Sequence, residues 1–230
     1  MSIISLPQKV EYSKGKNDTG TVSVLGCYPG YGTTIGNALR RVLLSSLEGS
    51  AVTSVKIKGV SHEFSAIEGV EEDVVQIVLN LKSLRVASHN DDPVKVVIKK
   101  AKEGPVTAGD IEKNADIEIS DPSQVICTIT DKKASLEMEL TIEKGVGYVP
   151  VDQQNREDIE LGSIAIDAVY TPIRRVNFSV ENMRVGKRTD YEKVTLEIHT
   201  DGSMDAQGAF NAAVSILNDQ FGALMEGSKE

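Results

Sequence analysis

The chain has 230 residues, and its 25 basic and 34 acidic side chains give a formal net charge of −9. With 40% hydrophobic and 26% charged residues, the composition is that of an ordinary globular protein, which excludes wholesale disorder. No apolar run approaches the roughly 20 residues that a membrane-spanning helix needs, and the acidic balance argues against a protein that wraps DNA over its whole surface.

The N-terminus, the cysteine content and the length indicate the cellular compartment and the number of domains. The N-terminus lacks a basic start followed by an apolar block, so we expect no signal peptide. The only cysteines, Cys27 and Cys127, are too few for a disulfide framework or a cysteine-based zinc site and suit a reducing cytosol. The length fits one large domain or two small ones.

Most of the chain has the alternation that is typical of strands with one wet face. The clearest case is residues 135–144, where four apolar residues alternate with four polar ones. Such alternation favours antiparallel sheets over a buried parallel sheet. Similar runs lie at residues 21–25, 52–59, 94–100, 124–130, 163–170, 175–181 and 194–200.

A first helix is predicted over residues 34–47, with Thr33 or Thr34 as its cap and Gly49 beyond its end. Leu44 points almost directly away from the apolar stripe and is flanked by Arg40 and Arg41. A lone exposed Leu is normal, but a Leu framed by two arginines also fits a partner surface, since Arg is enriched at interface hot spots. The stripe consists of Ile35, Ala38, Leu39, Val42, Leu43 and Ser46.

The run GYGTTIGN at residues 30–37 superficially resembles a phosphate-binding loop. A P-loop needs Lys directly after its last Gly, where its ammonium reaches the phosphates, but Asn37 follows Gly36 here. The glycine spacing also differs from the dinucleotide-binding pattern. We therefore predict a tight turn that leads into the helix rather than a nucleotide site.

The second helix is predicted over residues 70–82, with three acidic residues in its first turn. The third is predicted over residues 205–225. Its apolar face covers roughly half the circumference, wider than the face that a helix needs to lie on one sheet. This width fits either a broad contact inside the monomer or a second packing partner. The face consists of Ala206, Ala209, Phe210, Ala213, Val214, Ile216, Leu217, Phe221 and Leu224.

Catalytic groups are missing from the sequence. His62, His89 and His199 have no metal-ligand spacing, and no nucleophile elbow or paired Cys and His is present. No segment supplies a nucleophile, a base and an oxyanion site together. We therefore expect a non-enzymatic chain with no metal and no cofactor.

Two polar stretches remain open to more than one interpretation. Residues 150–161 form a polar loop, which is usually just solvated. Residues 174–193 form a basic stretch within an acidic chain, which fits an acidic partner surface, a phosphate, or simply a solvated edge. Its cations are Arg174, Arg175, Arg184, Lys187, Arg188 and Lys193.

Several long motifs occur in the order found in one known family. The run GYGTTIGNALRRVLLSSLEGSAVT at residues 30–53 resembles the signature of the bacterial RNA polymerase alpha subunit, in its N-terminal domain. The similarity continues essentially to the end of the chain. The further matching segments are residues 59–82, 104–111, 147–150 and 166–210.

The resemblance implies an α+β fold with two subdomains. Residues 1–48 and 172–230 are expected to form a dimerisation subdomain of antiparallel strands and two long helices, and residues 49–171 an inserted, mostly antiparallel β subdomain. It also implies a homodimer in which the first and last helices of each copy pack together. The interface residues that it implies are Tyr31, Ile35, Leu39, Phe210, Ala213, Leu217, Phe221 and Leu224.

The function that the resemblance implies is non-catalytic assembly of a DNA-directed RNA polymerase in the cytoplasm, at the nucleoid. The alpha dimer receives the beta and beta-prime subunits. Arg184 and Arg188 fit the family pattern either as contacts or as members of internal ion pairs. The full set implied in large-subunit binding is Arg40, Arg41, Leu44, Ser45, Glu68, Gly69, Lys82, Ile166, Asp167, Arg184 and Arg188.

The resemblance also reaches the polar loop, where Glu157, Asp158 and Glu160 match an acidic segment that contacts transcription activators in some members. Two features depart from the family pattern. Val146 stands where an Arg is usual, so the charge expected there is absent. Typical members also continue into a DNA-binding domain that this sequence does not include, so we expect no direct DNA binding from the chain.

Three hypotheses therefore stand at this point. The leading one is the homodimeric assembly scaffold. The second is a stand-alone dimeric binding module of the same fold, which would ignore the beta subunit. The third, an enzyme that holds phosphate in the glycine turn, is disfavoured by the missing Lys.

Overall fold

The computed structural model describes residues 4–16, 18–154, 160 and 162–226. The chain divides into two compact units, one made of Met1–Leu47 with Thr171–Glu230 and the other of Glu48–Tyr170. They are called unit 1 and unit 2 below. Both contain antiparallel sheets, and α-helices occur in each, which confirms the predicted α+β class.

Unit 1 is built on a four-stranded antiparallel sheet in the order β1-β2-β14-β13. The strands are β1 (Lys9–Lys14), β2 (Thr19–Cys27), β13 (Ile173–Val185) and β14 (Arg188–Thr200). Burial alternates along most of β2, so one face of the sheet supports the core and the other is wet. Strands from both ends of the chain therefore meet in one sheet.

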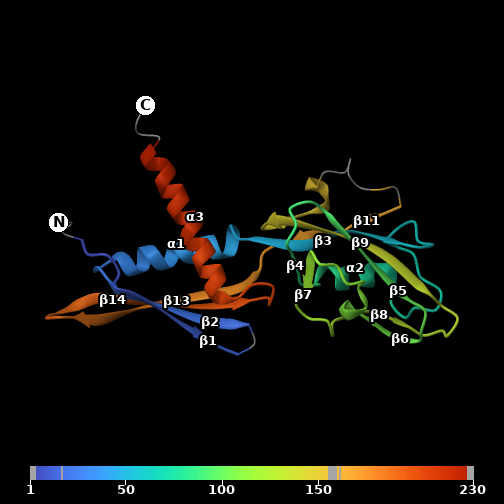
Figure 1. Cartoon of the computed structure of the whole chain (residues 1–230), viewed down its shortest axis with the longest axis horizontal. Coiled ribbons are helices and arrows are strands. Elements are labelled where there is room, and N and C mark those ends of the chain that lie inside the picture. The colour runs from blue at the N-terminus through green and yellow to red at the C-terminus, as the bar shows by residue number, and fades with distance from the viewer. Residues whose placement is uncertain (1–3, 17, 155–159, 161, 227–230) are drawn as a thin grey trace. The chain divides into compact units, whose positions relative to one another are not determined.

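Two helices cover the apolar face of this sheet, α1 (Tyr31–Ser45) and α3 (Ala206–Glu226). In Figure 1, α3 crosses α1. Their shared core with the sheet contains side chains from both helices and from β2, β13 and β14. Its fully or nearly fully buried members include Val22, Leu39, Leu43, Val194, Leu196, Ile198, Ala209 and Ala213.

Unit 2 contains a six-stranded sheet in the order β5-β9-β3-β4-β7, with β11 also paired to β3. Two smaller antiparallel pairs, β6-β8 and β10-β12, and the helix α2 (Val74–Lys82) complete it. The strands are β3 (Glu48–Ile57), β4 (Val86–Ser88), β5 (Val94–Lys100), β6 (Gly104–Thr107), β7 (Ile117–Ile119), β8 (Val125–Ile129), β9 (Leu136–Val146), β10 (Tyr148–Val149), β11 (Ile164–Ala165) and β12 (Ala168–Val169), and the short 3₁₀ turns are η1 (Ala108–Asp110) and η2 (Val151–Gln153).

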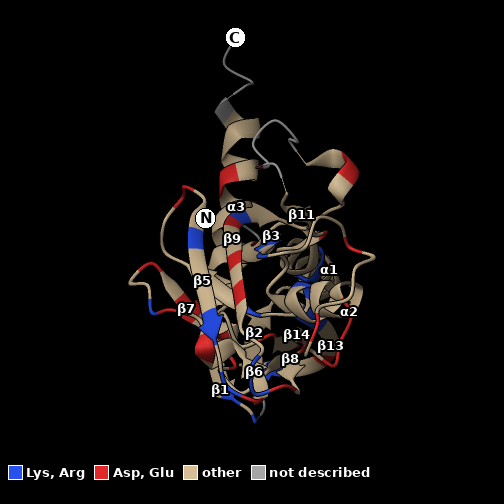
Figure 2. Ribbon diagram, turned by 90° about the vertical axis from the view of Figure 1, so that its right-hand side faces the viewer, with Lys and Arg blue, Asp and Glu red and all other residues tan. Residues whose placement is uncertain are grey.

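Strand β9 has the alternation that its sequence predicts. Its apolar residues lie in the core of unit 2, and its glutamates lie on the wet face, where Figure 2 shows them as repeated acidic bands. Glu137 accepts a hydrogen bond from Lys58 at 2.9 Å, and Lys95 lies 3.2 Å from Glu139. This face is therefore covered by exposed ion pairs, each worth little alone.

Helix boundaries differ from the sequence prediction for local reasons. Helix α2 begins at Val74, about four residues later than predicted, because the Asp73 side chain accepts a hydrogen bond from the Gln76 N–H at 2.8 Å and caps the helix there. Helix α1 begins at Tyr31, so the predicted caps Thr33 and Thr34 are wrong. Its first residue is preceded by Gly30, in the left-handed conformation.

Candidate functional site

The exposed side of α1 carries the four residues expected to meet a partner. Arg40, Arg41 and Ser45 are exposed, and Leu44 is 37% exposed. The Ser45 hydroxyl donates a hydrogen bond to the Arg41 carbonyl at 2.8 Å, one turn earlier in the same helix. Neither arginine takes part in an ion pair within the described chain. A leucine beside two uncompensated guanidinium groups therefore faces solvent.

The buried side of α1 explains the glycines of its first turns. A Cβ on Gly36 would lie 2.5 Å from a ring carbon of Phe178, and one on Gly32 would lie 2.9 Å from Val180. Residues 32 and 36 lie one turn apart, so this face of the helix presents no side chain and lies directly against β13. The GYGTTIGN run thus brings the helix close to the sheet.

The amide groups at the start of α1 are already occupied. The Glu192 carboxylate accepts hydrogen bonds from the Gly30 N–H at 3.0 Å and from the Gly32 N–H at 2.7 Å. These are the groups that would face a phosphate in a phosphate-binding loop. A carboxylate of the chain itself fills that place, which removes the physical basis for the nucleotide hypothesis.

Lys82 and Asp167, two predicted contact residues far apart in sequence, are paired with each other in unit 2. The Lys82 ammonium lies 2.8 Å from an Asp167 oxygen and 5.5 Å from the centre of the Tyr148 ring. The other Asp167 oxygen accepts the Val151 N–H at 3.0 Å. Lys82, followed by the Val151 N–H, lowers the pKa of the Asp167 carboxyl below its ordinary value. Ile166 is only 1% exposed, so the surface here belongs to its neighbours.

Glu68 and Gly69 lie in the loop that precedes α2. Glu68 is exposed, while the Gly69 carbonyl accepts the Thr130 N–H at 2.8 Å. Gly69 has φ +79°, and a Cβ there would lie 2.6 Å from the Ala134 Cβ. Gly69 is therefore required by the backbone, and only Glu68 of this pair offers a side chain to a partner.

The two arginines of the β13–β14 hairpin differ. Arg188 makes a bidentate pair with Asp190 at 3.0 and 2.6 Å and lies over the rings of Tyr28 and Tyr191. Asp190 raises the pKa of this guanidinium, which stays charged. Arg184 is exposed, and its Nε donates to the Gly186 carbonyl at 2.8 Å. Of the two sequence alternatives, the internal ion pair is therefore the one that the structure shows for Arg188.

The residues expected at a dimer interface fall into three groups by exposure. Leu39, Phe210 and Ala213 lie in the core of unit 1 and are at most 5% exposed. Ile35 and Leu217 are half-buried against that core. The side chains that a second chain can reach freely are Tyr31, Phe221 and Leu224, which are 42%, 61% and 73% exposed.

Of the three acidic residues matched to an activator contact, Glu157 and Asp158 lie outside the described residues. Glu160 is engaged on the wet face of the unit 2 sheet, where it accepts hydrogen bonds from Lys56 at 3.1 Å and from Lys95. Lys95, then Lys56, lowers the pKa of its carboxyl. This glutamate is therefore held by the chain itself.

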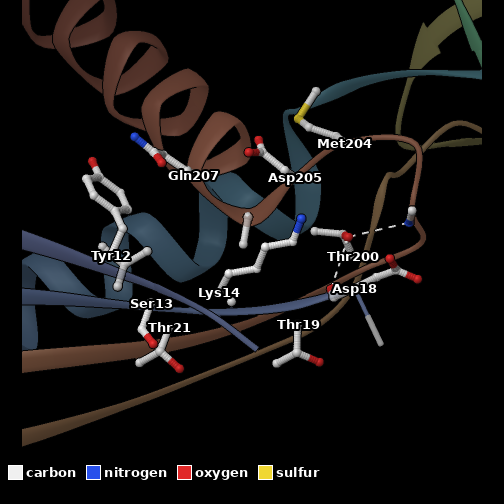
Figure 3. A pocket seen from close by; sticks show the side chains of 14 residues that line it. Tyr12, Ser13, Lys14, Asp18, Thr19, Thr21, Thr200, Met204, Asp205 and Gln207 are labelled. Carbon is white, nitrogen blue, oxygen red and sulfur yellow. Dashed lines mark hydrogen bonds between the residues drawn. The ribbon is translucent and has the colours of Figure 1, made fainter. Parts of the chain in front are cut away.

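A cavity of about 250 Å³ lies near the start of α3 in unit 1 (Figure 3). Lys14, Asp18 and Asp205 line it together with hydroxyl and apolar side chains, so its charges are mixed. The Asp205 carboxylate is engaged, since it accepts the Gly208 N–H at 2.7 Å. Nothing about this lining selects a particular ligand.

Among the described residues, no group of three or more His, Cys, Asp or Glu side chains is placed to hold a metal ion. Likewise, none of the described helices combines the length and the apolar content that a bilayer crossing requires.

Comparison with known proteins places the chain in a family. The pattern of the family described as the RNA polymerase Rpb3/RpoA insert domain matches residues 55–171, which is half of the chain. The chain belongs to this family. A curated relative, the DNA-directed RNA polymerase subunit alpha of Moorella thermoacetica, is 54% identical over 188 residues, or 82% of this chain. Those residues span 60% of the relative, so the chain corresponds to part of its length.

The RNA polymerase family membership confirms the resemblance seen in the sequence. The hydrogen-bond and ion-pair partners of the site residues, however, could be identified only from the structure. Sequence reasoning missed Glu192 because its position on β14 says nothing about the start of α1. One signal was present, namely that the first turn of α1 contains no acidic residue of its own. The pairing of Lys82 with Asp167 was equally hidden, since each was singled out separately.

Proposed function

We propose that this chain is a non-catalytic alpha-type subunit that forms a homodimer and nucleates assembly of an RNA polymerase in the cytoplasm, at the nucleoid. Family membership and the named relative support an RNA polymerase role. In this role residues 1–48 and 172–230 dimerise, and residues 49–171 are the inserted β subdomain. Transcription activators are a further expected partner class.

The single observation that carries the proposal is the exposed face of α1. Leu44 lies there beside Arg40 and Arg41. Desolvation of such a leucine together with charge-assisted contacts from arginine is the chemistry of interface hot spots. We assign this face to the beta subunit.

The homodimer is supported by the far end of α3. Phe221, Leu224 and Met225 are 61%, 73% and 74% exposed, although they are large and apolar. Burial of one such side chain is worth about 1.5–3 kcal/mol. Together with Tyr31 on α1 they offer a second copy a surface that each copy can present to the other.

In unit 2, Lys82 with Asp167 and the exposed Glu68 are proposed as further large-subunit contacts. Because Lys82 and Asp167 are paired in the free chain, they are available to a partner as one unit with one orientation. Arg184 is proposed as a contact, whereas Arg188 acts by holding the tyrosine rings beside it.

The test is capture of purified beta subunit by the chain and by the variants Arg41→Ala and Leu44→Ala. Each is expected to weaken beta binding at least about tenfold, the loss typical of a hot-spot side chain, with the dimer intact. The matched control is Arg174→Ala, since Arg174 is also exposed in unit 1 but lies on β13. If both α1 variants bind beta as tightly as the control, the assignment is wrong and the stand-alone dimeric module becomes the better account.

A further inference from the structure

Helix α1 starts without a cap of its own. The residue before it is Gly30, which has no side chain to accept a hydrogen bond, and the first turn contains no acidic residue. The first N–H groups of any helix lack partners within the helix, and the positive end of its dipole lies there. A helix start of this kind needs an acceptor from elsewhere.

Glu192 of β14 supplies that acceptor from 160 residues further along the chain. Its two carboxylate oxygens accept the N–H groups of Gly30 at 3.0 Å and Gly32 at 2.7 Å. Each oxygen therefore binds a different amide, so the carboxylate bridges the turn and the first residues of the helix. Charge-assisted hydrogen bonds of this type are about twice as strong as neutral ones.

The sheet is built to bring this carboxylate into place. The pairing of β14 with β2 shifts register between Glu192 and Val194, so that Glu192 lies opposite Cys27 at the end of β2. The extra residue lies on β2, where Gly26 has φ +74°. Such bulges re-aim a side chain, and here the side chain is aimed at the turn that follows β2.

The glycines of the turn fit the carboxylate as well. A Cβ on Gly32 would lie only 2.6 Å from the Glu192 Oε2 atom. Gly30 has φ +85°, a conformation that glycine adopts at no steric cost. The Gly-Tyr-Gly sequence therefore serves the approach of Glu192.

The same turn fixes the exposed aromatic residue of α1. The Tyr31 N–H donates to the Tyr28 carbonyl at 3.0 Å, and the two rings meet edge to face with centroids 6.1 Å apart. Tyr28 in turn contacts the ring of Tyr191, the neighbour of Glu192, at 6.2 Å. The carboxylate thus holds the residues on either side of Tyr31, Gly30 and Gly32, while the aromatic cluster holds the Tyr31 ring.

We propose that Glu192 is a positioning residue whose carboxylate acts as a built-in anion, setting the first turn of α1 and, through it, the Tyr31 ring that meets the second copy. The part that concerns the second copy rests on the proposed dimer. The proposal also defines the ligand class of the vacated turn, because removal of the side chain leaves two converging N–H groups that fit a small carboxylate such as formate.

The experiment compares Glu192→Ala with the wild-type chain and with Glu181→Ala, a control that removes an exposed carboxylate from β13. Amide exchange at Gly32 is expected to be about tenfold faster in the Glu192 variant, and its Tm about 3–6 °C lower. The dimer dissociation constant should rise as well. If Glu192→Ala does not fold, Glu192→Gln, which keeps one acceptor oxygen, is expected to show an intermediate loss.

Rescue separates positioning from simple packing. Sodium formate at the ionic strength of a sodium chloride control should restore the protection of Gly32 and the dimer affinity in Glu192→Ala, and should change neither in Glu181→Ala. Exchange at Gly32 that equals the control, or protection that formate does not restore, would overturn the proposal. Lost protection with unchanged dimer affinity would overturn the role of Tyr31. A wild-type chain that is monomeric would refute the dimer, while the exchange and rescue at Gly32 would still decide the role of Glu192.

Discussion

The two long helices of unit 1 differ in how they are capped and packed. Helix α1 is capped by Glu192, which lies far away in the sequence, and its glycines lie directly against β13. Helix α3 is capped by its immediate neighbour Asp205, packs through its first turns and leaves Phe221 and Leu224 exposed at its far end.

The difference shows which helix is packed along its length within the chain and which one leaves apolar side chains exposed. The buried face of α1 packs against the sheet of its own unit. The helix that carries the exposed Arg and Leu residues is therefore held in place by contacts within the chain. The far end of α3 carries apolar side chains with nothing described in the same chain to cover them. Uncovered apolar surface at a defined place is typical of a protein-protein interface.

The largest effect is expected from removing the uncovered end of α3. Phe221→Ala combined with Leu224→Ala should raise the dimer dissociation constant at least about 100-fold, because two side chains of about 1.5–3 kcal/mol each leave the interface. Analytical ultracentrifugation measures this constant. Asn218→Ala, an exposed position on the same helix, is the control and should remain dimeric. A double variant that dimerises like the control would show that α3 is not the interface.

Glycine-to-alanine changes should have opposite signs in the two helices. Gly36→Ala should lower the free energy of unfolding by about 1–2 kcal/mol, because its Cβ would lie 2.5 Å from the Phe178 ring. Gly222→Ala should raise it by up to about 1 kcal/mol, because nothing lies within 4 Å of that Cβ and Ala favours the helix. Urea unfolding measures both, in the Phe221→Ala, Leu224→Ala background so that no partner contributes. A stabilising Gly36→Ala would contradict the close contact of α1 with β13.

Loss of the local cap of α3 should have a smaller effect. Asp205→Ala removes the acceptor of the Gly208 N–H and should cost about 1 kcal/mol in urea unfolding. Asp205→Asn keeps a side-chain oxygen in place and is expected to lose only a fraction of that. If Asn proves as costly as Ala, the hydrogen bond is not what the aspartate contributes.

The smallest effect is expected at α2, a helix whose cap and last residue are both engaged within unit 2. The pKa of Asp167 is lowered, chiefly by Lys82, so its pairing stabilises the fold above the ordinary pKa of an aspartate. This contribution is lost as the pH falls below about 4 and through the folded-state pKa. It should stay below about 1 kcal/mol because each partner is about one-third exposed.

Asp167→Asn tests this pH dependence. The difference in unfolding free energy between wild type and this variant should shrink from pH 6 to pH 3. A difference for Asp167→Asn that is independent of pH would mean that the ion pair adds nothing measurable.

Much of the fold could be predicted from local patterns in the sequence. The alternation of β9 and the positions of β5 and β14 follow directly from period-two hydrophobicity, and the stripe of α1 from helical periodicity. Strand β1 was missed because its alternation is short: only Val10 and Tyr12 are apolar, and all six of its residues are exposed. The start of α1 was misplaced because its acceptor, Glu192, comes from a strand far along the chain.

The candidate site was predictable to a similar degree. The position of Leu44 opposite the core stripe predicts its exposure, which the structure confirms at 37%. The engagement of Arg188 with Asp190 and two tyrosines, and that of Glu160 with Lys56 and Lys95, depends on tertiary contacts. No spacing in one sequence reports such contacts.

The solution mass of the chain, alone and with purified beta subunit, tests the scaffold account most directly. Size-exclusion chromatography with light scattering should give about twice 24.8 kDa for the chain alone. Addition of beta should produce a species with two copies of the chain and one beta subunit. A species of 24.8 kDa that leaves beta unbound would contradict the account.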